Sequence, residues 1–106
     1  MRDVLARVQE LVGNGEVRIS EHGYDELAED GLTALEAVEG LFSATEVEEY
    51  SNYPKGPSVL VLQTAGDGSA MHVVWGIPKG YDKPAVLVTA YRPDPSRWDE
   101  SFLRRK

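Results

Sequence analysis

The sequence predicts an α+β fold in which N-terminal helices pack on one face of a four-stranded antiparallel sheet. Apolar residues recur at helical spacing in the first part of the chain and at a two-residue period from Thr45 onward. Turn residues separate the later segments at distances short enough for hairpins, which favours antiparallel pairing of neighbours. The 106 residues, of which 42% are hydrophobic, match the size of one domain with one core.

Three helices are expected before Thr45. The first begins near Val4 and stops at Gly13-Asn14-Gly15, where the residues suit a helix C-terminus and a turn. Ser20 offers a side-chain cap to a second helix that ends near Asp30. Thr33 can cap a third helix, whose expected apolar face consists of Leu32, Leu35, Val38, Leu41 and Phe42.

Four strand segments follow, at residues 45–51, 58–64, 71–77 and 85–92. The link at residues 16–19 is expected to be extended but is not counted as a strand of the sheet. Residues 96–106 are expected to form a short amphipathic tail whose Trp98 and Phe102 pack back on the domain. Core positions are expected at Leu5, Val8, Leu35, Val38, Leu60, Val73 and Leu87.

The net charge of −7 is unevenly divided along the chain. Residues 1–50 hold three arginines against thirteen carboxylates, a balance of −10, whereas residues 51–106 hold eight lysines or arginines against five carboxylates, a balance of +3. The overall charge argues against general binding of nucleic acid, because an acidic protein repels a polyanion at long range. Any anionic ligand is therefore expected at the C-terminal half.

Several classes of protein are excluded by what the sequence lacks. The absence of cysteine excludes disulfide scaffolds and thiolate metal sites. No apolar run approaches the roughly 20 residues that a membrane span needs, and the opening Met1-Arg2-Asp3-Val4 lacks the apolar core of a signal peptide. We therefore expect no membrane partner and a cytoplasmic location. A glycine-rich phosphate loop, a His-Glu-x-x-His zinc helix and a nucleophile elbow are also missing.

His22 is the first of two histidines and a candidate for proton transfer. It lies in the first turn of the expected second helix, where the positive end of the helix dipole favours the neutral ring. Asp25 and Glu26 follow on the same helix face, and either carboxylate could orient the imidazole. A neutral, oriented imidazole can act as a base. The alternative interpretation is an exposed helix-start histidine that is paired with a carboxylate and has no catalytic role.

His72 lies inside an apolar strand segment, where an imidazole needs a hydrogen-bond partner. A symmetric turn in each neighbouring hairpin would place Thr89 directly opposite His72 on one side and Gln63 on the other. Tyr91 would lie one step along on the same face. We expect these side chains to form a polar row on the sheet, and the alternative is a buried row that serves only the structure.

Three motifs carry a resemblance to a known family. They are Ser20-Glu21-His22 at the start of a helix, Met71-His72-Val73-Val74 on a strand, and Thr89-Ala90-Tyr91-Arg92-Pro93-Asp94 after it. Together they resemble the bacterial family called domain of unknown function 4258, over nearly the whole chain. That family looks like a member of the group of small ribonuclease toxins that share the barnase, EndoU, colicin and RelE fold. The resemblance therefore implies a RelE-like ribonuclease toxin fold.

The same resemblance implies a metal-independent endoribonuclease that is one component of a bacterial toxin–antitoxin pair. It places functional groups at the matching positions His22, His72, Thr89 and Tyr91. The implied partners are RNA and an antitoxin protein, and no cofactor or metal is implied.

Cleavage of RNA through the ribose 2′-hydroxyl needs a base, an acid and a group that stabilises charge on the phosphate. We assign His22 as the base and His72 as the acid, and these two roles can be exchanged. Thr89 and Tyr91 are expected to donate hydrogen bonds to the phosphate. Its charge would be neutralised by Arg92 or Lys79.

Two other functions are consistent with the residues alone. One is a non-enzymatic acidic protein-interaction module of the same fold, whose helical half binds a basic partner and whose polar row is structural. The other is a divalent-metal site formed by the two histidines with Asp25 or Glu26, for which the spacing offers no specific support.

Overall fold

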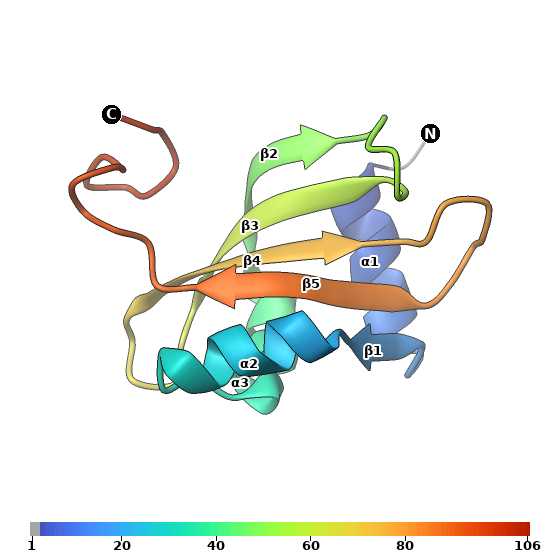
Figure 1. Cartoon of the computed structure of the whole chain (residues 1–106), viewed down its shortest axis with the longest axis horizontal. Coiled ribbons are helices and arrows are strands. Elements are labelled where there is room, and N and C mark those ends of the chain that lie inside the picture. The colour runs from blue at the N-terminus through green and yellow to red at the C-terminus, as the bar shows by residue number, and fades with distance from the viewer. Residues whose placement is uncertain (1–2) are drawn as a thin grey trace.

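The computed structural model describes residues 3–106 and has an α+β architecture of three helices and one mixed sheet (Figure 1). Met1 and Arg2, and with them half of the opening tetrapeptide, lie outside the described residues. The helices are α1 (Val4–Gly13), α2 (Glu21–Glu29) and α3 (Ala34–Gly40), with a short 3₁₀ helix, η1 (Leu41–Ser43). The strands are β1 (Val17–Ile19), β2 (Thr45–Tyr50), β3 (Ser58–Thr64), β4 (Ala70–Gly76) and β5 (Ala85–Tyr91).

The α+β class is confirmed, and the three helices and the four later strands lie within two residues of their predicted bounds. Among residues 3–106, no helix has the length and apolar character needed to cross a membrane.

Two of the helices begin at the residues that the sequence predicts as caps. The Ser20 hydroxyl accepts a hydrogen bond from the Gly23 amide at 2.9 Å. The Thr33 hydroxyl accepts one from the Glu36 amide at 3.1 Å, while the Glu36 carboxylate accepts one from the Thr33 amide at 2.8 Å. These bonds satisfy amides that have no partner inside the helix. Local chemistry therefore decides where α2 starts, and it places His22 in the first turn.

The prediction of a four-stranded antiparallel sheet is wrong, because the sheet has a fifth strand and its order is β1-β5-β4-β3-β2. Val17 of β1 lies opposite Ala85 and Ile19 opposite Leu87, and β1 and β5 run parallel. A parallel pair joins segments that are far apart in the sequence, so no hairpin turn reveals it. The other four strands form the predicted antiparallel meander.

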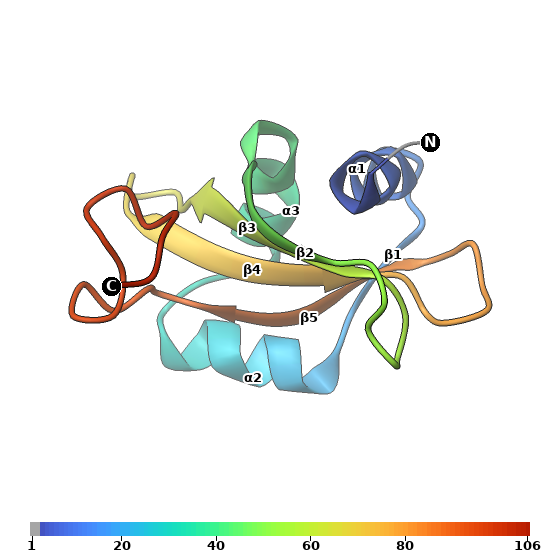
Figure 2. The same cartoon turned by 90° about the horizontal axis from the view of Figure 1, so that it is seen from above.

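The prediction that all helices pack on one face of the sheet is also wrong. Figure 2 shows α1 and α3 on one side of the sheet and α2 on the other, along β5. α2 follows β1 directly, and at this junction the Ser20 hydroxyl donates to the Val88 carbonyl oxygen at 2.9 Å. Gly23 permits the close approach, since a Cβ atom there would lie 2.8 Å from a methyl carbon of Leu87. α2 therefore holds His22 beside β5.

The predicted core is largely confirmed. Buried positions include Val8, Leu60, Val73 and Leu87, while Leu5 and Val38 are partly buried against the core. The prediction that Leu35 belongs to the core is wrong, since this residue is 66% exposed. Phe42, on the same expected apolar face, is 52% exposed. α3 has seven residues and buries Ala37, so the face that it turns inward is narrower than the spacing indicates.

The register between β4 and β5 differs from the predicted one, although the predicted face is correct. His72 pairs with Tyr91, and Thr89 lies diagonally across from it, opposite Val74. The pairing of β4 with β5 is shifted by one residue because the loop between these strands is not centred where the prediction places it. A bulge after Val74 shifts the pairing by one more residue. Two single-residue shifts restore the original side of the sheet. His72, Thr89 and Tyr91 therefore share a face, as predicted, but His72 and Thr89 are not direct neighbours.

The placement of Gln63 in the polar row is wrong. Leu62 lies opposite His72, and this slip of one residue turns Gln63 to the other face of the sheet. Gln63 is buried there. Its amide nitrogen donates to the Ala37 carbonyl oxygen at 2.8 Å, and its amide oxygen accepts from Trp75 Nε1 at 2.9 Å. Gln63 thus links α3 to the sheet core.

Residues 94–106, which we call the C-terminal segment, fold back on the sheet in a series of turns and do not form a regular amphipathic element. Asp94 and Asp99 accept backbone and hydroxyl hydrogen bonds from the serines two residues later, and such turns compete with helix formation. Phe102 adopts a φ of 59°, outside the helical region. The prediction that Trp98 packs back is confirmed, since this side chain is buried.

Replacing Gln63 by leucine is expected to lower the free energy of unfolding by about 2–4 kcal/mol, because Trp75 Nε1 and the Ala37 carbonyl each lose a buried partner. Urea denaturation followed by tryptophan fluorescence measures the change. Thr64→Val is the control, because Thr64 is the next residue of β3 and is exposed; it should change stability by less than about 0.5 kcal/mol. Equal stability of Gln63→Leu and wild type would contradict this role.

Candidate functional site

The candidate site lies on the sheet face opposite α1 and α3, which we call the open face. His72, Val74, Thr89 and Tyr91 point to it from β4 and β5. In Figure 2, α1 and α3 lie on the other side of the sheet and α2 flanks the open face along β5. The C-terminal segment follows the end of β5 and covers His72 on the open face.

His72 is fully buried on this face, and both of its ring nitrogens have partners. Nε2 lies 2.8 Å from the Phe102 carbonyl oxygen, and Nδ1 lies 3.3 Å from the Tyr91 hydroxyl. A carbonyl only accepts, so Nε2 carries the proton and Nδ1 accepts from the Tyr91 hydroxyl. The Trp98 ring packs edge-on against the imidazole at 4.5 Å between centroids. His72 therefore holds the C-terminal segment on β5 and is out of reach of a substrate.

Burial is also the main cause of the electrostatic state of this pair. Desolvation lowers the pKa of His72 below its usual 6.5, against the opposing effect of the Phe102 carbonyl, and the Arg105 charge lowers it further. Desolvation raises the pKa of the Tyr91 phenol above its usual 10, while Arg105 acts in the opposite direction. Both side chains are therefore uncharged near neutral pH.

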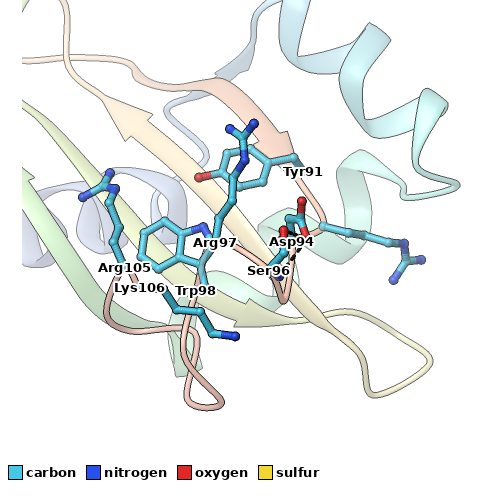
Figure 3. Close-up of a pocket in the computed structure, with 8 residues that line it drawn as sticks. Tyr91, Asp94, Ser96, Arg97, Trp98, Arg105 and Lys106 are labelled. Atoms are coloured by element: carbon cyan, nitrogen blue, oxygen red, sulfur yellow. Dashed lines mark hydrogen bonds between the residues drawn. The ribbon is translucent and has the colours of Figure 1, made fainter.

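The C-terminal segment and the end of β5 line an open cavity of about 640 Å³, which we call the tail pocket (Figure 3). Its lining consists of Tyr91, Arg92, Asp94, Ser96, Arg97, Trp98, Arg105 and Lys106. Four of these side chains are basic and one is a carboxylate. Such an excess of cations in a concave surface favours an anion.

The charges in the tail pocket are held by different partners. Arg105 lies over the Trp98 ring at 4.8 Å from its centroid, and it pairs with Glu48 of β2 at 2.8 Å. Hydrogen bonds from the backbone and hydroxyl of Ser96 lower the pKa of Asp94, and the charges of Arg97 and Lys106 add to this effect. Neither Arg97 nor Lys106 has an ion-pair contact among residues 3–106. These two cations are the ones most available to a bound anion.

His22 lies at the other border of the open face, on α2, and its side chain is 72% exposed. Its Nε2 contacts Glu26 Oε1, and the Thr89 hydroxyl donates to the same carboxylate oxygen. Of the two carboxylates considered from the sequence, Glu26 therefore orients the ring. The carboxylate accepts a hydrogen bond from Nε2–H, so in the neutral ring Nδ1 carries the lone pair. This arrangement leaves a proton acceptor at the surface, tied to β5 through Thr89.

The two cations that the sequence suggests as phosphate ligands lie at opposite ends of the sheet. Arg92 follows β5, where its guanidinium contacts the Asp30 carbonyl oxygen at 3.0 Å, the Ser69 hydroxyl and Asp67. It lines the tail pocket but serves mainly to hold three loops together. Lys79 follows β4, and its amide donates to the Lys55 carbonyl oxygen at 3.0 Å. The length of β5 separates Lys79 from Arg92, so one phosphate cannot contact both.

Three cations that line the tail pocket with Tyr91 and Arg92 are not among the site residues that the sequence predicts. Arg97, Arg105 and Lys106 belong to the segment predicted to be an amphipathic tail, in which Arg104, Arg105 and Lys106 suit a helix C-terminus. The one sequence signal that points to them is the balance of +3 in residues 51–106. The hypothesis of a metal site has no ligand set, since no three histidine, aspartate or glutamate side chains converge among residues 3–106.

The buried neutral state of His72 predicts a loss of stability on acidification. The unfolded chain takes up a proton near pH 6.5, whereas the folded protein does so only at lower pH. Stability contributed by the neutral ring is therefore present above about pH 6.5 and decreases below it, by at most about 1.4 kcal/mol per pH unit. Urea denaturation at pH 8, 6.5 and 5.5 measures this slope. His72→Gln should remove this component and His22→Gln should retain it; an unchanged slope in His72→Gln would contradict the assignment.

Comparison with family models matches residues 19–92 to the family described as Domain of unknown function (DUF4258). The matched stretch contains His22, His72, Thr89 and Tyr91, together with the strands that carry the open face. Comparisons with curated proteins and with solved structures found no match. Because the family match spans more than half of the chain, this protein belongs to the DUF4258 family.

Proposed function

We propose that this protein is a metal-independent endoribonuclease whose active site spans α2, β5 and the tail pocket. The observation that carries the proposal is the chain of contacts from the exposed His22 through Glu26 to Thr89, on the strand that ends in Tyr91. A proton acceptor, a hydroxyl donor and a group of cations thus border one surface. These are the groups that phosphodiester transfer within RNA requires.

In the proposed reaction, the ribose 2′-oxygen attacks the adjacent phosphorus while His22 Nδ1 takes the 2′-hydroxyl proton. The bond from phosphorus to the 5′-oxygen breaks, and the Tyr91 hydroxyl gives its proton to this leaving oxygen. The products are a 2′,3′-cyclic phosphate and a 5′-hydroxyl end. The proton on His22 then returns to Tyr91 through solvent, which restores both groups. The step consumes no water molecule, because the 2′-oxygen is the nucleophile.

Tyr91 suits the role of the acid for two reasons. Its phenol is protonated at neutral pH, since burial raises a pKa that is ordinarily about 10 already. Its hydrogen bond to His72 measures 3.3 Å, longer than the usual range, so the hydroxyl can turn toward a substrate. This assignment moves the acid from His72 to Tyr91, and His72 becomes a positioning residue that holds the tyrosine and the C-terminal segment.

The cations of the tail pocket would bind the phosphate that gains charge during the reaction. Arg97 and Lys106 are the candidates without an ion-pair contact among residues 3–106, and Arg105 is preorganised by Glu48 and Trp98. The motifs shared with the DUF4258 family, which resembles small ribonuclease toxins, lie at His22, His72 and Thr89 to Tyr91, the residues grouped around this surface. That resemblance supports the same reaction and a role as a toxin component.

The acid and the base can be tested by single substitutions. His22→Gln and Tyr91→Phe are each expected to lower the rate of RNA cleavage by about two to four orders of magnitude, the usual contribution of a positioned acid or base. The measurement is cleavage of an end-labelled single-stranded RNA at neutral pH with a chelator present. Glu26→Gln should also slow cleavage, because it weakens the orientation of His22.

Matched controls are available for both positions. Asp25→Asn changes the exposed carboxylate next to Glu26, and Tyr81→Phe changes a tyrosine that is 70% exposed in the β4–β5 loop. Neither should alter cleavage. If the purified wild-type protein cuts no RNA, the acidic interaction module becomes the better function, with the exposed Leu35 and Phe42 as its contact surface.

The phosphate contacts predict a specific salt dependence. The double variant Arg97→Ala/Lys106→Ala is expected to bind all single-stranded RNA sequences more weakly. The slope of log K against log salt should become shallower by about 1.4, or about 0.7 for each lost contact. Fluorescence anisotropy at several salt concentrations measures both effects. Arg7→Ala on α1 is the control and should leave the slope unchanged; an unaltered slope in the double variant would exclude these phosphate ligands.

A further inference from the structure

A second cavity on the open face is not used by the proposed proton transfers. Its volume is about 490 Å³, within the range of small-ligand sites. Val74 of β4 and Val88 of β5 belong to its apolar lining, and Tyr50 and Tyr53 line it at the end of β2. We propose that this cavity, which we call the tyrosine groove, binds one unstacked base of a single-stranded nucleic acid.

The lining of the tyrosine groove suits a flat aromatic ring. Tyr53 is 50% exposed, and Tyr50 is partly buried with its hydroxyl donating to Glu48 at 2.9 Å. Bases stack on such side chains with little dependence on sequence, because every base has a π-face. The valine side chains offer an apolar surface for the same ring, and they disfavour a ligand that is charged throughout.

The cations of the groove indicate that the aromatic ligand also carries negative charge. Arg18 and Lys55 line the groove, whose lining contains no carboxylate. Neither cation has an ion-pair contact among residues 3–106. Although the chain has a net charge of −7, the lining of the groove is positively charged and therefore favours an anion. A nucleotide combines the aromatic ring and the phosphate that these side chains require.

Hydrogen bonds link residues of the groove to the proposed active site on two sides. Thr89 lines the groove and donates to Glu26, the carboxylate that orients His22. Tyr50 is joined through Glu48 to Arg105 of the tail pocket. The placement of the bound base next to the scissile phosphate rests on the proposed function. Base binding in the groove itself does not.

Base insertion also defines the substrate class. A base inside a duplex is stacked and paired, and it cannot enter a groove on a sheet without leaving its helix. The groove therefore selects single strands and accepts different bases. Discrimination among bases would come from groups other than the two tyrosines.

The test uses a single-stranded deoxyoligonucleotide, which has no 2′-hydroxyl and cannot be cleaved by the proposed reaction. Its dissociation constant for the full chain is measured by fluorescence anisotropy. Tyr53→Ala is expected to raise this constant by about 5- to 100-fold, the range that base–aromatic stacking contributes. Tyr81→Ala, outside the groove lining, is the control and should leave it unchanged.

A second probe separates base binding from phosphate binding. An abasic deoxyoligonucleotide of the same length keeps the phosphates, and Tyr53→Ala should not change its dissociation constant. An equal effect on both probes, no effect on either, or no binding of the base-containing probe by wild type would overturn the groove. Base-dependent binding without any RNA cleavage would sustain the groove and refute the nuclease. If the protein cleaves RNA but Tyr53→Ala leaves the binding of the base-containing probe unchanged, the nuclease is sustained and the groove is refuted.

Discussion

The position of the C-terminal segment depends on one buried imidazole. His72 places a polar ring on the open face of the sheet, where a nitrogen without a partner is costly. The Phe102 carbonyl satisfies Nε2 from the C-terminal segment, and Tyr91 satisfies Nδ1 from β5. Trp98 closes the contact with its ring edge-on to the imidazole. Removing the segment would expose both aromatic surface and an unsatisfied ring, so the segment and the sheet stabilise one another.

This contact also arranges charge. With the segment docked, Arg105 reaches Glu48 on β2, and Arg97 and Lys106 are brought to the cavity beside Tyr91. The acidic N-terminal half does not cancel this local potential, because salt screens exposed charges beyond about 8–10 Å. An overall charge of −7 therefore slows the approach of a polyanion, while the tail pocket and the tyrosine groove still favour one at short range.

Burial divides the two histidines into different chemical roles. His22 is exposed and held by Glu26, so its free nitrogen can exchange a proton with a ligand. His72 is enclosed, and desolvation keeps it neutral and engaged with protein atoms. From the sequence alone the two histidines are equivalent candidates for the acid and the base, because each lies within a motif of the same family. Their difference depends on the docking of residues 94–106 over His72, a contact between positions thirty apart in the sequence.

Local chemistry in the sequence determined the three helices, the caps Ser20 and Thr33, and the four later strands. Ser20 and Thr33 act through neighbours three residues away, and the turns act between adjacent strands, so short-range patterns contain this information. The parallel pairing of β1, the slip that moved Gln63 and the selection of Glu26 over Asp25 depend on distant segments. The tail pocket depends on contacts between Phe102 and His72, thirty positions apart. Only the tertiary structure could decide these features, because each is a competition among long-range contacts that the sequence does not rank.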